Sequence, residues 1–159
     1  MKIGVVSDTH GRPLPPQMLQ DFKTVDLIVH AGDIGSLETL KTLSALQEVK
    51  AVYGNMDGAD IREEVPADMT ISCGNQVIGI YHGEGAPKSL LEKVGERFRK
   101  TKVDVIIFGH SHESFNEVRD GILYFNPGTP NDRICASCCS YGILTVSDKG
   151  IKGQIIKVK

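Results

Sequence analysis

The 159-residue chain has no long apolar run, no excess of one charge and few cysteines. No segment approaches the roughly 18 apolar residues that a membrane-spanning helix needs. The N-terminus enters a strand-like segment directly, without the pattern of a signal peptide. The formal net charge of −2 argues against a broad basic surface for nucleic acid. We therefore expect a cytoplasmic protein that binds no membrane and does not use nucleic acid as its main partner. Its oligomeric state cannot be read from the chain.

The four cysteines do not have the spacing of a four-ligand zinc site. Cys135, Cys138 and Cys139 form a C-x-x-C-C segment, and Cys73 stands alone. A second C-x-x-C pair is missing, and no histidine follows Cys139. Small apolar thiols beside a strand are the favoured interpretation, and a regulatory role for the thiols stays open.

The chain also lacks internal repeats, low-complexity segments and linkers, which predicts one domain over residues 1–159. Short runs rich in Val and Ile, bounded by Gly, Asn, Asp or Pro, predict strands. The predicted strands are Lys2–Ser7, Leu27–His30, Val49–Tyr53, Met69–Cys73, Gln76–Tyr81, Val103–Phe108, Ile122–Phe125, Tyr141–Val146 and Ile151–Val158.

Helical periodicity predicts three helices between these strands, at Pro15–Phe22, Leu37–Gln47 and Lys88–Lys100. Ser36 is the candidate N-cap of the second helix. Strands and helices alternate at the front of the chain, which predicts a parallel core with crossover helices. The strand-rich C-terminal third predicts antiparallel additions.

Side chains that bind metals follow five of the predicted strands. In open α/β sheets, functional groups gather beyond the carboxyl ends of the strands. The five segments are SDTHG, HAGDIG, YGNMDG, YHGEG and FGHSHES, and together they use four of the five histidines in the chain. The candidate site residues that they supply are Asp8, His10, Asp33, Asn55, His82, His110 and His112.

Seven oxygen and nitrogen ligands are too many for one tetrahedral zinc ion. They suit two metals of intermediate hardness that share one carboxylate. Without metal, the same cluster would gather desolvated carboxylates and histidines at a considerable cost. Each segment alone has an ordinary explanation as a turn or a satisfied histidine, but the joint occurrence at five strand ends favours a metal centre.

The series D-x-H, G-D, G-N-x-D, H-G and G-H-x-H resembles the calcineurin-like metallophosphoesterase superfamily. The short chain and the NPGT segment (Asn126–Thr129) resemble its small prokaryotic phosphodiesterase branch. The resemblance runs from Lys2 to about Thr129. It implies an α/β fold of two facing mixed β-sheets flanked by helices, the α/β/β/α metallophosphoesterase sandwich.

The resemblance also implies a dinuclear site and an activity. The implied ligands are Asp8, His10 and His112 for one metal, Asn55, His82 and His110 for the other, and Asp33 as the bridge. The implied reaction is hydrolysis of small phosphodiesters by attack of a metal-bridging hydroxide. Manganese is the expected ion in vitro, and Ni, Co, Fe, Zn or Mg are alternatives.

One position departs from the superfamily pattern. Many relatives carry a histidine between the Asn and the acidic residue of G-N-x-D, and it assists the leaving group. This chain has Met56 there, which cannot donate a proton. We therefore expect better activity on esters with good leaving groups, such as aryl phosphodiesters. For Asp57 we expect a hydrogen bond that supports the ligands.

Several other residues have weaker functional claims. His30 is expected to pack or to support the ligands. Asn126 and Thr129 either line the site or form an ordinary turn. Arg12 and Arg133 could contact a phosphate, although solvated arginines are the simpler interpretation. The basic segment Arg97–Lys102 is interpreted as a solvated helix end, where cations are favoured.

Two other functions compete with the phosphodiesterase. A phosphomonoesterase acting on nucleotides or phosphoproteins would use the same site, which should be open because a chain of this length has little room for a cap domain. A metal-binding scaffold for protein interactions is the alternative from a different class, since a retromer coat subunit resembles these enzymes. All seven ligand positions match in this chain, which favours catalysis.

Overall fold

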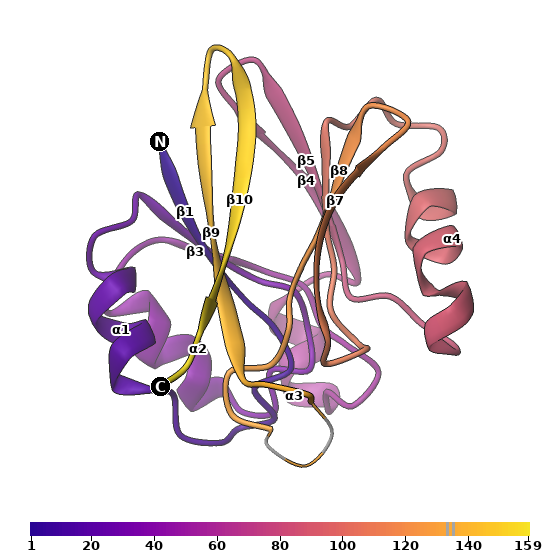
Figure 1. Ribbon diagram of the computed structural model, residues 1–159. Coiled ribbons are helices and arrows are strands. Elements are labelled where there is room, and N and C mark those ends of the chain that lie inside the picture. Colours follow the sequence, from indigo (N-terminus) through magenta and orange to yellow (C-terminus); the bar gives the residue numbers. More distant parts are fainter. Residues whose placement is uncertain (133, 135) are drawn as a thin grey trace.

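Two five-stranded sheets face one another and carry helices on their outer sides (Figure 1). This computed structural model describes residues 1–132, 134 and 136–159. The first sheet contains β1 (Lys2–Val6), β2 (Leu27–His30), β3 (Val49–Ala51), β9 (Ser140–Ser147) and β10 (Gly150–Lys157). The second contains β4 (Asp68–Cys73), β5 (Gln76–Tyr81), β6 (Val105–Ile107), β7 (Ser114–Arg119) and β8 (Ile122–Pro127). The helices are α1 (Pro16–Phe22), α2 (Leu37–Ser44), α3 (Ala59–Glu64) and α4 (Pro87–Arg97).

Both sheets are mixed, and each contains three adjacent parallel strands. The order in the first sheet is β10-β9-β1-β2-β3, with β1, β2 and β3 parallel and β9 antiparallel to β1. The order in the second is β4-β5-β6-β8-β7, with β5, β6 and β8 parallel and antiparallel strands at both edges. The predicted parallel core, the antiparallel additions and the two-sheet sandwich are confirmed.

The main core lies between the sheets and explains the apolar strand sequences. On β1, Ile3 and Val5 belong to the cluster between the sheets, whereas Val6 packs with the residues of α1. On β6, Val105 and Ile107 face the first sheet, whereas Ile106 packs with the residues of α4. Strands that are buried on both faces read as continuous apolar runs, which is how these segments stand out in the sequence.

Helices α1 and α2 cover the first sheet and α4 covers the second (Figure 1). The backbone N–H of Thr39 donates to Ser36 Oγ over 3.3 Å, so the predicted N-cap is confirmed. The second and third predicted helices end three residues early, at Ser44 and Arg97. Both ends continue into turns, since Gln47 N donates to Leu43 O and Arg99 N to Glu96 O.

Two elements were not predicted. Helix α3 has six residues, of which only Ile61 is buried, so it has no apolar periodicity to reveal it. Strand β7 lies at a sheet edge, and all its residues except the half-buried Phe115 are exposed. Strand β7 is held by its antiparallel pairing with β8, and α3 packs through Ile61 against Ile34 and Ala51. Among the described residues, no helix combines the length and the apolar character needed to cross a membrane.

Candidate metal centre

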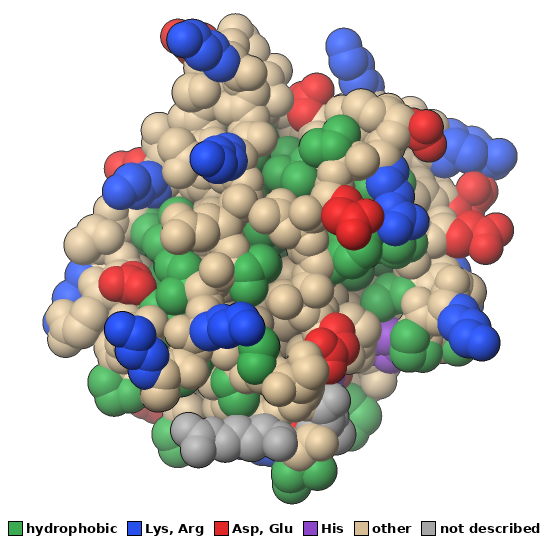
Figure 2. Space-filling view, viewed as in Figure 1, with side chains coloured by type: hydrophobic (Ala, Val, Ile, Leu, Met, Phe, Trp, Pro, Cys, Tyr) green, Lys and Arg blue, Asp and Glu red, His purple; other side chains and the backbone are tan. Residues whose placement is uncertain are grey.

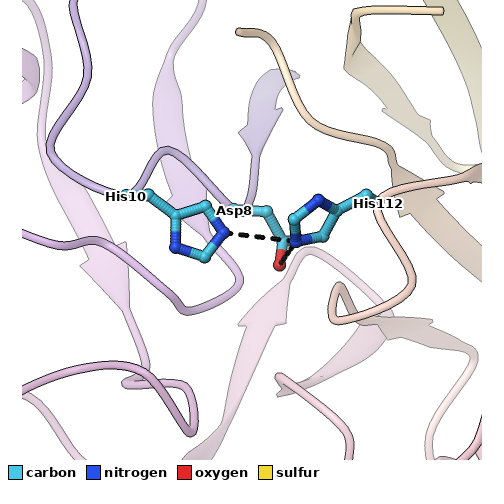
Figure 3. Close-up of side chains that lie close together, drawn as sticks. All are labelled: Asp8, His10 and His112. Atoms are coloured by element: carbon cyan, nitrogen blue, oxygen red, sulfur yellow. Dashed lines mark hydrogen bonds and ion pairs between the residues drawn. The ribbon is translucent and has the colours of Figure 1, made fainter. Parts of the chain in front are cut away.

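The loops after β1 and β6 bring three predicted ligands together at the carboxyl edge of the sheets (Figure 3). His112 Nε2 lies 3.3 Å from Asp8 Oδ1 and 3.2 Å from His10 Nε2. Asp8 is fully buried, and the two histidine side chains are 20% and 17% exposed. Three converging donors with a partly open side have the chemistry of a divalent metal site.

A second group of donors shares Asp8 with the first. It consists of Asp8, Asp33 and His82, with one ligand atom of each within 4.8 Å of the others. His82 Nε2 lies 3.4 Å from Asp33 Oδ2 and 3.9 Å from Asp8 Oδ1. Asp33 Oδ2 also lies 4.0 Å from His10 Nε2, so this carboxylate stands between the two groups.

Two buried atoms at this place indicate that the donors fit metal ions. Asp8 Oδ1 and His82 Nε2 are buried and make no hydrogen bond within the described residues, and only the ion-pair contacts of 3.3–3.9 Å with His112, with Asp33 and with each other are left to them. Such atoms normally find a partner, because leaving one unpaired costs about 1–3 kcal/mol. The opposite nitrogen of His82, Nδ1, donates to Ala31 O over 2.8 Å, which leaves Nε2 as the metal-facing atom.

The backbone at the ligands is strained. Among the described residues, six that are not glycine have a positive φ, and five of these are predicted ligands. The five are Asp8 (φ 56°), His10 (49°), Asp33 (52°), His110 (69°) and His112 (60°). Left-handed conformations of such residues cost on the order of 1–3 kcal/mol each and cluster at functional sites. The strain therefore supports a function at this edge that ordinary turns would not require.

Two glycines are required beside the buried carboxylates. A Cβ on Gly54 would lie 2.1 Å from Asp33 Oδ1 and 2.5 Å from Asp33 N. A Cβ on Gly109 would lie 1.9 Å from Ser7 Oγ and 2.7 Å from Asp8 Oδ2. The glycines of G-N-x-D and G-H-x-H thus leave the space that the carboxylates fill.

The two remaining predicted ligands, Asn55 and His110, lie next to the cluster and contact each other. His110 Nδ1 is 3.0 Å from Asn55 Oδ1, and His110 Nε2 is 2.8 Å from the carbonyl of Gly85. The ring centroids of His110 and His82 are 5.3 Å apart, and the backbone N–H of His110 donates to Asp8 Oδ2. In this arrangement both ring nitrogens of His110 face protein atoms, and its role as a ligand stays a prediction.

The ionisable groups of the cluster shift one another's pKa. Burial lowers the pKa of His82, but the adjacent carboxylates of Asp33 and Asp8 outweigh burial and raise it above its ordinary value. Burial raises the pKa of Asp33, but the interactions with His82 and with the N–H of Met56 outweigh burial. The pKa of Asp33 is therefore lowered below its ordinary value. The carboxylate of Asp8 raises the pKa of His112 against the effect of burial. Without metal, these groups therefore favour ion pairs between histidine and carboxylate.

Asp132 is a site residue that the sequence interpretation missed. Its Oδ2 lies 3.0 Å from His112 Nδ1, and its Oδ1 lies 3.3 Å from a terminal nitrogen of Arg12. A carboxylate on the far nitrogen of a histidine orients the ring and makes it a better metal ligand. Asp132 sits in a loop without a motif, and only its position after NPGT could have drawn attention to it. Arg12, a candidate phosphate contact, binds this carboxylate.

Asp57 ties two ligand loops together, as predicted. Its carboxylate accepts from the backbone N–H groups of Gly35 over 2.8 Å, Ile34 over 3.1 Å and Gly54 over 2.8 Å. Its neighbour Met56 contributes through the backbone, because its N–H donates to Asp33 Oδ1 over 2.8 Å. These bonds hold the Asp33 loop against the Asn55 loop.

His30 is fully buried and supports the site from behind, which confirms the packing role. His30 Nε2 lies 2.9 Å from Thr9 Oγ1, and Nδ1 accepts from the N–H of Gly32 over 3.2 Å. Thr9 in turn donates to Ile34 O. Burial lowers the pKa of His30 to about 3, so the ring is neutral at physiological pH.

The NPGT segment also supports the ligand loops. Asn126 Nδ2 donates to Gly109 O over 2.8 Å and to Ser111 Oγ over 3.1 Å. Thr129 Oγ1 donates to Asp8 O over 2.9 Å. Both residues are fully buried. Both residues therefore fix the backbone that carries the ligands, which an ordinary turn would not do, and their lining of the site stays a prediction.

The remaining candidates that the structure describes belong to neither of the two donor groups. Cys73 and Cys139 are buried thiols and Cys138 is partly exposed, whereas Cys135 and Arg133 fall outside the described residues. The segment Arg97–Lys102 is largely a solvated helix end, with Arg99 paired to Glu96 over 3.2 Å. Arg97 differs from the rest of this segment, because it forms an ion pair with Asp68.

Comparisons with known proteins show which proteins this chain resembles. The sequence profile of the calcineurin-like phosphoesterase superfamily domain matches residues 1–149. A phosphodiesterase of Methanocaldococcus jannaschii is 34% identical, over 92% of this chain and 90% of that protein. A structure described as a novel archaeal phosphodiesterase has a TM-score of 0.77 at 30% identity, with 98% of this chain and all of the other covered. Zinc-bound Vps29 of Entamoeba histolytica has the same TM-score of 0.77 at 23% identity, with both chains fully covered, which shows a shared fold.

Proposed function

The chain belongs to the calcineurin-like phosphoesterase superfamily, and from that premise we propose that it is a metal-dependent phosphodiesterase with a dinuclear site. One observation carries the proposal. Buried Asp8 and Asp33 converge with His10, His82 and His112, and two of the donor atoms are left without hydrogen bonds. Catalysis of phosphoester hydrolysis is the chemistry that such a cluster supplies in this superfamily.

The proposed ligands are the seven residues of the strand-end motifs. The first metal would be held by Asp8, His10 and His112, the second by Asn55, His82 and His110, with Asp33 shared between them. The position of Asp33 Oδ2, 3.4 Å from His82 Nε2 and 4.0 Å from His10 Nε2, supports the shared role. Histidine, amide and carboxylate donors suit Mn, Fe, Co, Ni or Zn better than an all-oxygen magnesium site, and we propose Mn²⁺ for activity in vitro.

Two bound cations would supply a hydrolytic nucleophile at neutral pH and neutralise charge on the phosphoryl group. The protein itself contributes orientation. Asp132 orients His112, Ala31 orients His82, and Asp57 fixes the loops between the two donor groups. Met56 is 69% exposed and offers no proton to a leaving group. We therefore propose a preference for aryl diesters, whose phenolate leaves without protonation.

A small phosphoester is the proposed substrate. On the face drawn in Figure 2, Lys and Arg side chains stand apart from one another among acidic, apolar and neutral groups, so this face presents no continuous basic surface for a long polyanion. A scaffold function, as the likeness to Vps29 suggests, would not require two buried carboxylates, nor the strained backbone that presents them. Hydrolysis of monoesters at the same site is the nearer alternative.

The proposal is tested by metal removal and addition. The protein is stripped with chelator and titrated with Mn²⁺, and hydrolysis of bis(p-nitrophenyl) phosphate is measured beside p-nitrophenyl phosphate. We expect Mn²⁺-dependent turnover with a higher kcat/KM for the diester, and a loss of at least about a hundredfold in His112→Ala.

A second test variant is Asp33→Asn, and its matched control is Asp120→Asn. Both replace a carboxylate on a left-handed backbone, but Asp120 lies in the hairpin between β7 and β8. Only Asp33→Asn should abolish activity. A preference for the monoester would favour a phosphatase, and tight Mn²⁺ binding without turnover of either ester would favour the scaffold.

A further inference from the structure

A groove of about 350 Å³ opens directly beside the candidate metal centre. Asn55 and His82, both proposed ligands of the second metal, line one part of it. Tyr53, Arg62, Tyr81 and Arg97 line the rest, together with smaller neighbours and the exposed Glu84. A phosphodiester with its phosphorus at the metals would extend one ester arm into this groove.

Two arginines are placed on the groove wall by tyrosine rings. The guanidinium carbon of Arg62 lies 4.6 Å from the ring centroid of Tyr53, and that of Arg97 lies 5.2 Å from the centroid of Tyr81. Rings and guanidinium groups both stack on planar ligands, and an arginine held against a ring loses less freedom when it binds an anion. The wall therefore combines stacking surface with positive charge.

The two arginines differ in their remaining partners. Arg97 forms an ion pair with Asp68, which neutralises its charge. Arg62 instead donates to backbone carbonyls, from Nε to Asp57 O over 2.8 Å and from one terminal nitrogen to Gly54 O and Asn55 O. Within the described part of the chain no carboxylate pairs with Arg62, and its side chain is exposed. Arg62 is thus a fixed, unneutralised cation next to a proposed ligand.

The charged side chains beyond Tyr81 indicate which end of the groove favours an anionic group. A neighbouring hollow of about 540 Å³ shares Tyr81 and Arg97 and is lined by Glu84, Glu92 and Glu96 against a single lysine, Lys93. A second anionic group on a substrate would be repelled there. The favourable place for such a group is the Arg62 side of the groove.

We propose that this groove binds the ester arm that stays on the phosphorus, and that this arm carries a planar ring and a second phosphate, as in a nucleotide. The inference rests on the proposed phosphodiesterase function and names its substrate class. Water adds its oxygen to the phosphorus, the bond to the other ester oxygen breaks, and a phosphomonoester, an alcohol or phenol and a proton are formed. The ring stacks on the Tyr81 and Arg97 wall, and the second phosphate binds Arg62.

Three substrates with one leaving group separate these contacts. They are methyl p-nitrophenyl phosphate, thymidine 5′-(p-nitrophenyl phosphate), and the same thymidine ester with a 3′-phosphate. With Mn²⁺-loaded protein we expect kcat/KM to rise by about tenfold from methyl to thymidine through stacking. The 3′-phosphate should add about another tenfold through a charge-assisted contact.

Arg62→Gln should remove the gain from the 3′-phosphate, and Arg62→Lys should retain part of it. Turnover of the methyl ester in each variant corrects for any disturbance of the Asn55 loop. The matched control is Arg119→Gln, because Arg119 also lies over a ring, 5.1 Å from the centroid of Phe115, but outside the groove. Tyr81→Leu should remove the gain from thymidine.

Binding gives a second readout that does not depend on turnover. Thymidine 3′,5′-bisphosphate is titrated calorimetrically into metal-free protein, and Arg62→Gln should weaken it by about tenfold. If no diester is hydrolysed but this loss occurs, the groove stands and the phosphodiesterase function fails. If diesters are hydrolysed with equal kcat/KM for the three substrates, or if Arg62→Gln behaves like Arg119→Gln, the groove assignment is overturned. If Arg62→Gln does not fold, the kcat/KM values of the wild-type protein for the three substrates test the groove assignment by themselves.

Discussion

The two ends of the sheets differ in which residues take the left-handed backbone positions of their turns. At the far end, the hairpins of both sheets turn at Gly74, Gly121 and Gly150, and a Cβ at any of these would meet no atom within 4 Å (Figure 1). At the metal end, left-handed conformations fall on aspartate and histidine as well as on glycines, and Gly54 and Gly109 stand where a Cβ would collide with a carboxylate. Only one residue of the far end other than glycine, Asp120, shares this backbone conformation among the described residues.

The difference separates turns that merely reverse the chain from turns that present a side chain. A hairpin gives the left-handed position to glycine, which adopts it without a steric cost. The metal end accepts strain at five positions, and it keeps Asp8 and Asp33 buried in addition. Strain and buried charge persist only where the surrounding structure imposes them. Here Asp57, His30, Asn126 and Thr129 supply that support through hydrogen bonds to the loops.

The largest expected effect on stability comes from replacing one glycine by alanine, at the metal end in one variant and at the far end in another. In Gly54→Ala the Cβ would lie 2.5 Å from the backbone nitrogen of Asp33, so the loops must separate. We expect the free energy of unfolding of metal-free protein to fall by about 3 kcal/mol. In Gly121→Ala the space is open and only the backbone conformation is unfavourable, so the loss should be about 1 kcal/mol. Urea unfolding measures both, and equal losses would contradict the contrast between the ends.

A smaller effect should appear as a dependence on pH. The pKa of His30 falls from 6.5 to about 3 on folding because the ring is buried. Below pH 6.5 His30 becomes protonated in the unfolded chain but stays neutral in the folded protein. His30 therefore lowers the free energy of unfolding as the pH decreases. The limiting slope is about 1.4 kcal/mol per pH unit.

The measurement compares wild type with His30→Gln in chelator at pH 7, 6 and 5. At pH 7 the wild type should be more stable, because its ring bonds to Thr9 and Gly32. The difference in unfolding free energy between the two proteins should shrink as the pH falls. A difference that stays constant from pH 7 to pH 5 would mean that His30 titrates normally in the folded protein.

The smallest expected effect tests the strain itself. His10 has a φ of 49°, and its side chain is partly exposed. His10→Gly and His10→Ala both remove the imidazole, but only glycine relieves the backbone. Metal-free His10→Gly should therefore be about 1 kcal/mol more stable than His10→Ala. Both should lose Mn²⁺-dependent activity, and equal stability of the two variants would show that the loop is not strained.

The sequence could predict the metal end because its chemistry is local. Each motif places a donor within four residues of a strand end, and parallel strands bring those ends together. Asp132 escaped prediction because it reaches His112 only through the fold, from a loop twenty residues away. The groove escaped prediction for the same reason: Arg62 sits on α3, a helix too short and too polar to be recognised, and Tyr81 faces it from the other sheet.

Side-chain orientation was also beyond the sequence. The resemblance to the superfamily implied that His110 and His112 are ligands of two different metals. The structure places His112 in the cluster beside Asp8 and turns His110 toward Asn55 and the carbonyl of Gly85. Residue spacing fixes where a backbone passes, but the rotation of a ring depends on the partners that surround it.

Because the ligands come from both sheets, metal binding has a consequence for the stability and degradation of the protein. Asp8 and Asp33 follow strands of the first sheet, whereas His82 and His112 follow strands of the second. A cation held by both would act as a removable cross-link between the two halves, worth about 2.7 kcal/mol at a hundredfold excess of ion over its dissociation constant. Proteases attack the opened chain, so the abundance of the protein in a cell would follow the supply of divalent metal.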